Sequence, residues 1–285
     1  MGQKATSFIP INQAHAIVEV VMFVQFEHEF DDILIQKLLE LAQELKEELP
    51  QHKVVQRIEA TFEGGQARPQ KLPAEASVKS VGVELQSFKR DGTLAWMLRT
   101  LDNGFSVHCL DYSTWEEVWA QARKYLYKAF HKLEGTDNKI SIIGLKYVDR
   151  FLYEGSREEY TPYGLFNAET DLIFRRAFSA TPIWHCHVGW FEDLQGFGPC
   201  INQLNINTIY GNISGSEKHI TNIDHNAIFR IKSNGMDFAP FIRENDDNTT
   251  YIHQVMNALH LMNKHILAHL LCKEMARRIN LGVEM

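Results

Sequence analysis

The sequence lacks the features that mark several large classes of protein. It has four cysteines among 285 residues, namely Cys109, Cys186, Cys200 and Cys272, and no two of them form a C-x-x-C pair. This spacing argues against a dense disulfide framework and against a cysteine-based zinc motif. It is typical of reduced, buried thiols in a reducing compartment.

Long apolar runs and basic runs are missing as well. The longest uncharged apolar stretch lies around residues 20–24, far below the roughly 20 residues that a membrane-spanning helix needs. The N-terminus lacks the basic start and apolar core of a signal peptide. The formal net charge is −7, and no basic stripe indicates general nucleic-acid binding. We therefore expect a cytoplasmic protein that neither spans a membrane nor binds nucleic acid in general.

The motifs of the common enzyme classes are also absent. The sequence contains no G-x-S-x-G elbow and no G-x-x-x-x-G-K-[ST] loop, and no G-x-G-x-x-G joins a strand to a helix. Neither H-E-x-x-H nor another metal-binding signature occurs. These absences lead us to expect no cofactor and no metal.

The periodicity of the apolar residues predicts a mixture of strands and helices. Alternating or continuous apolar patterns predict strands at residues 18–26, 54–62, 81–88, 93–101, 105–110, 140–152, 183–193, 201–210 and 219–231. Helical spacing predicts helices at residues 31–49, 113–133 and 250–279. Asp91-Gly92 and Asp102-Asn103-Gly104 are tight-turn sequences, so residues 81–110 should form an antiparallel meander with Gly92 and Gly104 at positive φ.

The order of these elements contains a loose repeat. Four strands and a helix over about residues 53–133 are followed by four strands and a helix over about residues 139–279. This order predicts an α+β fold of two antiparallel sheets, each backed by a helix, with an extra strand and helix in front. Internal duplication of a ββββα unit is one interpretation. The N-terminal half would span residues 1–152 and the C-terminal half residues 153–285, as two domains or one continuous domain.

The strand at residues 140–152 carries three charges within apolar sequence. Because side chains alternate across a strand, Lys146 and Arg150 share one face and Asp149 lies on the other. Charges in a largely buried strand need partners. We expect covered ion pairs that hold the fold, and a functional cleft is the alternative. The irregular connector after this strand, residues 154–182, is the expected hinge or lid, with a short helix over residues 172–178.

The C-terminal strands are unusually polar. The residues concerned are His185, His187, Asn205, Asn207, Asp224 and His225. If their faces converge, they form a hydrogen-bonding cleft for a polar ligand or a peptide. The solvated side of an antiparallel sheet is the simpler interpretation.

Two histidine pairs invite a metal hypothesis. Strand alternation places His185 and His187 on one face and Cys186 on the other, which disfavours a joint site. His265 and His269 are four residues apart on the last predicted helix, where packed or solvated histidines are ordinary. His185 and His187 could still reach a metal together with a carboxylate such as Asp224 from a nearby strand. Because no metal-binding signature supports that alternative, we expect no metal at either pair.

Three segments together resemble one protein family. They are residues 16–27, residues 112–117 and residues 143–150. They resemble segments of a sporadically distributed, functionally uncharacterised bacterial family of similar length. Its first strand tends to read Pro-Ile-Val-Glu-Ala and its middle strand Gly-Leu-Arg-Tyr-Ile-Asn-Arg, and Leu259-His260 matches a Leu-His pair in its last helix.

The chain departs from that family pattern at a few positions. Ala16 stands where the family often has Pro, and Lys146 and Asp149 stand where it more often has Arg and Asn. These differences leave the expected fold unchanged, but they argue against a binding role that the middle strand would share with the family. The resemblance implies a fold but no established activity. A patchy bacterial distribution is typical of mobile accessory genes, including phage-defence genes.

Three classes of function stay open at this point. The leading hypothesis is a non-enzymatic binding or assembly protein, acting as a homo-oligomer or with a protein partner, since sheet edges pair readily with another chain. Such a protein could be a sensor or accessory subunit of a bacterial defence or stress system. The alternatives are a hydrolase or nuclease-like enzyme that uses the polar C-terminal strands, and a small-ligand binder with a cavity beside the long closing helix.

Overall fold

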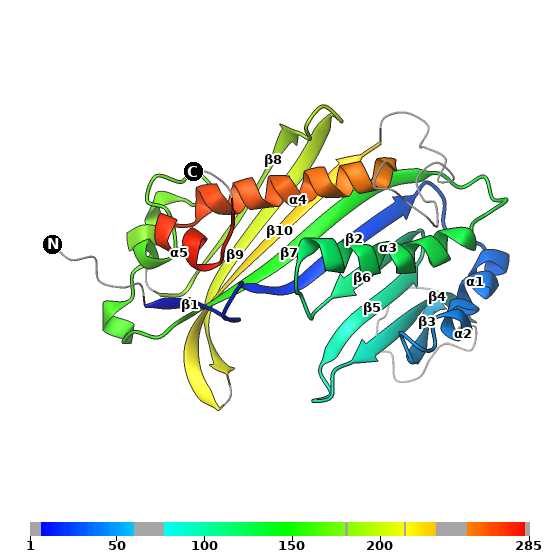
Figure 1. Cartoon of the computed structure of the whole chain (residues 1–285), viewed down its shortest axis with the longest axis horizontal. Helices are drawn as coiled ribbons and strands as arrows, with labels where there is room; N and C mark the ends of the chain where they lie inside the picture. Colours follow the sequence, from blue (N-terminus) through cyan, green and yellow to red (C-terminus); the bar gives the residue numbers. More distant parts are fainter. Residues whose placement is uncertain (1–6, 60–76, 180–181, 214, 232–249, 283–285) are drawn as a thin grey trace, which may run out of the picture.

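The strand-like segments of the chain join into one antiparallel sheet (Figure 1). The computed structural model describes residues 7–59, 77–179, 182–213, 215–231 and 250–282. The strands are β1 (Phe8–Pro10), β2 (Ile17–Phe26), β3 (Gln51–Glu59), β4 (Ser77–Phe88), β5 (Leu94–Leu101), β6 (Gly104–Cys109), β7 (Ile140–Tyr153), β8 (Trp184–Asp193), β9 (Pro199–Ile213) and β10 (Ser216–Arg230). The α-helices are α1 (Asp32–Leu39), α2 (Leu41–Glu44), α3 (Trp115–His131), α4 (Tyr251–Leu270) and α5 (Lys273–Arg278).

The strand order is β3-β4-β5-β6-β2-β7-β10-β9-β8, with β1 paired to β7. The expected pair of separate sheets is therefore wrong. β2 and β7 pair directly, from Ile17 opposite Asp149 to Phe26 opposite Ile140, and this pairing merges the two halves. Both strands are rich in apolar residues, as expected for strands in the interior of a sheet. Each has a neighbouring strand on both edges: β6 and β7 flank β2, and β2 and β10 flank β7. The sheet also crosses the boundary expected at residue 152, because β7 pairs with β10.

The two halves are built in a similar way but are not identical, because the first has the five strands β2 to β6 and the second has the four strands β7 to β10. This order differs from the repeat of four strands and a helix expected from residue 53 onward, and an internal duplication stays a prediction. In the first half, β2 is followed by the meander from β3 to β6, and β6 returns to pair with β2 before α3. In the second half, β7 is followed by β8, β9 and β10, and β10 returns to pair with β7 before α4. The strand expected to stand in front of the repeat, β2, lies at the centre of the sheet, between β6 and β7.

The helices pack on one face of the sheet. Figure 1 shows α3 and α4 side by side in front of the strands, with α4 crossing β7 and β10 and α3 lying over β6. The largest hydrophobic cluster lies between these helices, α1 and the sheet. Two indoles join the helices, because Trp115 Nε1 donates to Asn257 Oδ1 at 2.7 Å and Trp119 Nε1 donates to His253 Nδ1 at 2.8 Å. No described helix is long and apolar enough to span a membrane.

The long C-terminal helix expected at residues 250–279 is interrupted. Leu271 and Cys272 take extended backbone angles between α4 and α5. There the chain pairs with the connector, since Leu271 forms a β-bridge with Phe166 and the Cys272 N–H donates to the Leu165 carbonyl at 2.9 Å. The helix expected within the connector at residues 172–178 is a 3₁₀ turn at Arg175–Ser179.

The meander of β4, β5 and β6 agrees with the turn sequences. Gly92 has φ +82°, as expected. Gly104 does not, because Asp102 occupies the left-handed region at φ +54° instead. Aspartate tolerates that region better than most residues, since its short side chain can bond to nearby backbone.

We predict unequal effects for alanine at two glycines of this meander. A Cβ on Gly82 would lie 1.8 Å from the Thr100 carbonyl oxygen, whereas a Cβ on Gly92 would meet open space. Gly82→Ala should therefore destabilise the fold by about 3 kcal/mol or more through overpacking, and Gly92→Ala by about 1 kcal/mol through its positive φ. Urea unfolding of the two variants measures both values. Equal destabilisation would contradict the close approach of β4 and β5.

Candidate functional site

The polar residues of the C-terminal strands fall on two different faces. His185, His187, Asn205, Asn207 and Asp224 lie on the face opposite the helices, where His187, Asn205 and Asp224 form one row across β8, β9 and β10. His225 is the exception among the six expected residues, because alternation turns it toward α4. It is buried between Asn263 and Asn202, with bonds of 2.8 and 3.1 Å to its two ring nitrogens. Burial lowers the pKa of His225.

Several side chains on the polar face pair across strands, whereas Asn205 Oδ1 and Asn226 Oδ1 have no hydrogen-bond partner among the described residues. Lys146 Nζ lies 2.8 Å from Asp224 Oδ2, and Arg150 Nε donates to Asn222 Oδ1 at 2.8 Å. Asn226 Nδ2 donates to Gln203 Oε1 in the same region. The Lys146 pair is half-exposed, so solvent screening keeps its contribution small, about 1 kcal/mol or less. This face therefore combines polar pairs across strands, and few of its charges are left for a ligand.

Asp149 differs from its charged neighbours. It lies on the helix-covered face and is only 2% exposed. No hydrogen bond or ion pair of its carboxyl group is present in the described residues, where the expected partner of Asp149 is therefore not found. Desolvation by burial raises its pKa from 3.8 to about 7. A buried carboxyl group without a partner is unusual and marks a candidate functional position.

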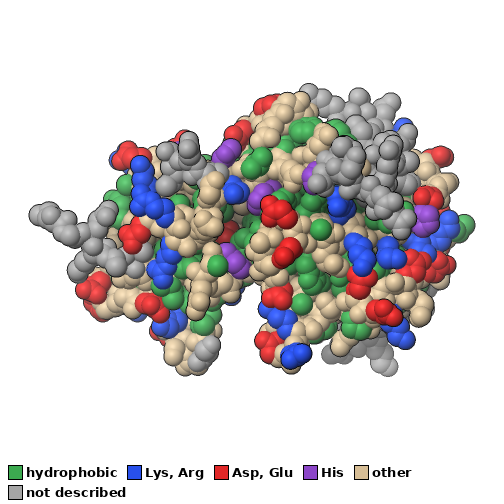
Figure 2. Space-filling model, viewed as in Figure 1, with side chains coloured by type: hydrophobic (Ala, Val, Ile, Leu, Met, Phe, Trp, Pro, Cys, Tyr) green, Lys and Arg blue, Asp and Glu red, His purple; other side chains and the backbone are tan. Residues whose placement is uncertain are grey.

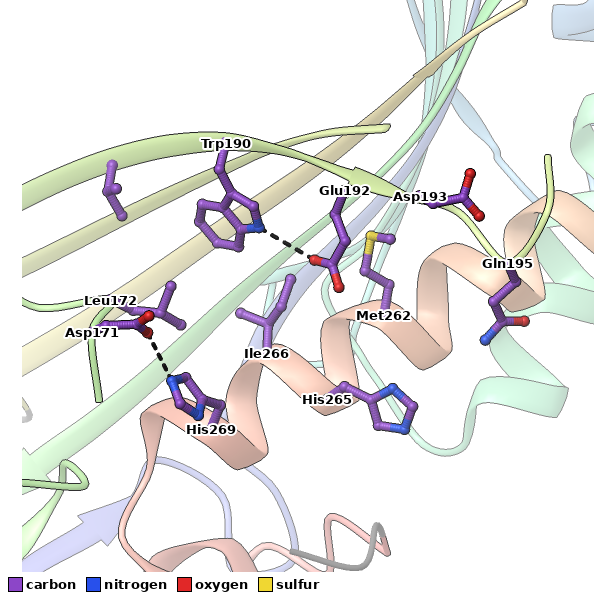
Figure 3. Close-up of a pocket in the computed structure, with 11 residues that line it drawn as sticks. Asp171, Leu172, Trp190, Glu192, Asp193, Gln195, Met262, His265, Ile266 and His269 are labelled. Carbon is purple, nitrogen blue, oxygen red and sulfur yellow. Dashed lines mark hydrogen bonds and ion pairs between the residues drawn. The ribbon is translucent and has the colours of Figure 1, made fainter. Parts of the chain in front are cut away.

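A groove lies between the strand β8 and the helix α4 (Figure 3). We call it the β8–α4 groove, and its volume is about 560 Å³. Its lining residues are Asp171, Leu172, Val188, Trp190, Glu192, Asp193, Gln195, Met262, His265, Ile266 and His269.

The local structure of each element explains how it contributes to the groove. Val188, Trp190 and Glu192 alternate along β8, so all three face the helix. Met262 and Ile266 are one turn apart on α4 and form a buried apolar floor, as Figure 3 shows. The groove thus has apolar walls on both elements.

The rim of the groove is acidic. Asp171, Glu192 and Asp193 supply carboxylates, and none of the lining residues is Lys or Arg. Asp171 Oδ1 lies 2.8 Å from His269 Nε2, and Glu192 Oε2 accepts from Trp190 Nε1 at 3.2 Å. An apolar floor within a charged rim is the usual arrangement of a site that binds a peptide or protein.

The strand β8 is also an edge strand. In the described part of the chain, β8 pairs with β9 on one side and with no strand on the other. An edge strand presents N–H and C=O groups that another chain can use. The groove can therefore receive side chains of another chain, and the N–H and C=O groups along the edge of β8 can bond to the backbone of that chain.

Sequence reasoning found part of this groove and missed the rest. The histidines His265 and His269 were considered as metal ligands, but His269 pairs with Asp171, and no group of three or more potential ligands meets in the described residues. Asp171, Glu192 and Asp193 were missed. The acidic pair at the end of a strand was visible in the sequence, but its position at a sheet edge beside a helix was not.

The search for related proteins gave no match among family models, curated proteins or solved structures. The resemblance to the bacterial family therefore depends on the matching segments alone. The groove and the buried Asp149 are the two features of the structure that point to a function.

We predict that Asp149→Asn stabilises the protein at alkaline pH. The pKa of Asp149 is raised in the folded state, so folding takes up a proton between pH 3.8 and about 7. The free energy of unfolding of the wild type therefore falls as the pH rises through this range, and above it the buried carboxylate has its full destabilising effect. The variant should gain about 2–4 kcal/mol in the free energy of unfolding at pH 8, and clearly less at pH 5. Urea titrations at both pH values measure the gain. A loss of stability at pH 8 would reveal a cation paired with Asp149.

Proposed function

We propose that this protein is a non-enzymatic binding protein that takes an extended segment of a partner protein into the β8–α4 groove. The segment would add as a further strand on β8. The observation that supports this proposal is the coincidence of an edge strand with a groove that has an apolar floor and an acidic rim.

Strand addition suits the geometry of β8. This strand is ten residues long, enough for several backbone hydrogen bonds with an added chain. Alternate side chains of the added segment would point into the groove and contact Trp190, Met262 and Ile266. On the opposite face, Phe191 is 72% exposed and offers an apolar contact to the remaining side chains.

The charge of the rim defines the chemistry of the partner segment. Carboxylates at Asp171, Glu192 and Asp193 favour Lys or Arg side chains, and the Trp190 ring can add a cation–π contact. We therefore expect a segment in which basic and apolar residues alternate. The acidic rim makes a second copy of the same groove a poor partner. A homo-oligomer and a role in bacterial defence or stress remain predictions from the sequence, and sedimentation velocity measures the first.

The binding mode can be tested with selected peptides. Display selection of random ten-residue peptides on the wild-type protein should enrich sequences with alternating apolar and basic residues. The best peptide is then made in two N-methylated forms, one at odd positions and one at even positions. An added strand uses only alternate N–H groups, so one form should lose at least about tenfold in affinity by fluorescence anisotropy and the other should bind nearly normally.

A charge-reversed variant tests the groove itself. Glu192→Lys with Asp193→Lys should weaken the selected peptide at least about tenfold through repulsion. Glu134→Lys with Glu217→Lys makes the same change in net charge at exposed positions of other elements and should leave the affinity nearly unchanged. Equal sensitivity to both N-methylated forms, or equal loss in both charge variants, would rule out strand addition in this groove.

A further inference from the structure

A second cavity lies where α3 begins, between β7 and the middle of α4. Its volume is about 360 Å³. Five parts of the chain line it: the segment entering β2, the residues from Tyr112 to Glu116 at the start of α3, the strand β7, the helix α4 and residues 279–281 near the C-terminal end. Figure 1 shows the N-terminal end of α3 beside α4 at this place. The cavity is separate from the β8–α4 groove.

Asp149 lines this cavity from the sheet. Its side chain is almost completely buried and has no partner among the described residues. The strand β2 is irregular directly opposite, where the register shifts between Ile17 and Glu19. Bulges of this kind often lie beside functional sites because they redirect neighbouring side chains. A carboxyl group held unpaired in a cavity indicates a donor group that comes from outside the chain.

One neighbouring group that could have served Asp149 is already occupied. The Tyr147 hydroxyl lies 2.7 Å from His260 Nδ1. The His260 ring stacks on the Trp115 indole with 4.4 Å between centroids and an angle of 7° between planes. These aromatic rings therefore form a fixed wall of the cavity. Such a wall suits the apolar body of a small ligand and the face of a cation.

The charges around Asp149 leave an excess of negative charge. The ionisable groups that face the cavity are His15 before β2, Tyr112 and Glu116 at the start of α3, Tyr147 on β7, and His260 and Lys264 on α4. Burial lowers the pKa of His15, and it lowers the pKa of His260 to about 4, so both are neutral at pH 7. Burial raises the pKa of both tyrosines, which stay protonated. Once Asp149 is ionised, its carboxylate and that of Glu116 therefore face the single cationic side chain of Lys264.

We propose that this cavity binds a small organic amine or amidine, whose charged N–H group pairs with Asp149 and whose body packs against Trp115. The cation replaces the solvent that Asp149 loses on burial, and only the ionised carboxylate can pair with it. Ligand binding must therefore release the proton that Asp149 holds below pH 7. The affinity should fall as the pH is lowered through that value.

Matched probe compounds test the proposal directly. Tyramine and benzamidine carry the cation, whereas 4-ethylphenol and benzamide have similar shapes without it. At pH 8 the two cations should raise the melting temperature of the wild-type protein, and the neutral compounds should not. Isothermal titration should show an affinity for the better cation about tenfold weaker at pH 6 than at pH 8, as expected for one group with pKa near 7.

Two variants separate the site from general effects. Asp149→Asn keeps the shape of the side chain and should weaken cation binding at least about tenfold and remove its dependence on pH between 6 and 8. Asp137→Asn removes a carboxylate from an exposed position after α3 and should bind as the wild type does. Circular dichroism confirms that both variants are folded. The proposal is overturned if neither cation binds the wild-type protein, or if Asp149→Asn binds as well as Asp137→Asn.

Discussion

The antiparallel pairing of β2 with β7 is the interaction on which the rest of the structure depends. These two strands join halves that otherwise each consist of a strand, a returning meander and a helix. Without this pairing, each half would expose an apolar strand as a sheet edge, which promotes aggregation. With it, the path of paired strands in the described residues ends at β3 on one side and at β8 on the other. The pairing of β2 with β7 at the centre therefore leaves β8, and with it the proposed binding groove, at one end of the sheet.

The central position of β7 also explains the state of Asp149. In an edge strand an aspartate at this position would reach water, but β7 has β2 and β10 on its two sides and α4 above it. The charge of Asp149 is therefore desolvated by the same packing that stabilises the sheet. Lys146 and Arg150 avoid this cost because alternation turns them to the opposite face, where Asp224 and Asn222 are within reach.

Local signals in the sequence were sufficient to predict most individual elements. The Asp91-Gly92 and Asp102-Asn103-Gly104 turns predicted the meander, and the helical spacing of apolar residues predicted the helix at residues 113–133. That helix is α3, and Thr114 caps it by accepting from the Glu117 N–H. Pairings between distant residues were not predictable in this way. One sheet or two depends on whether residue 21 meets residue 146, and periodicity carries no information about that contact.

For the site residues too, local features were predictable from the sequence and contacts between distant segments were not. Alternation along single strands correctly separated Asp149 from Lys146 and grouped His185 with His187. It could not reveal that Asp149 lacks a partner, because that depends on what α3 and α4 bring to the other side. The groove could not be predicted from the sequence for a similar reason, since Glu192 and His269 line one groove only because α4 crosses the sheet.

The interruption between α4 and α5 has a mechanical consequence for the groove. The Asn167 N–H donates to the Leu270 carbonyl and the Cys272 N–H donates to the Leu165 carbonyl, both at 2.9 Å, so the connector is fastened to the end of the helix on both sides of Phe166. Asp171 and Leu172 follow a few residues later and form one wall of the groove. The end of α4 and the residues that follow it therefore hold this wall of the groove in place through backbone hydrogen bonds.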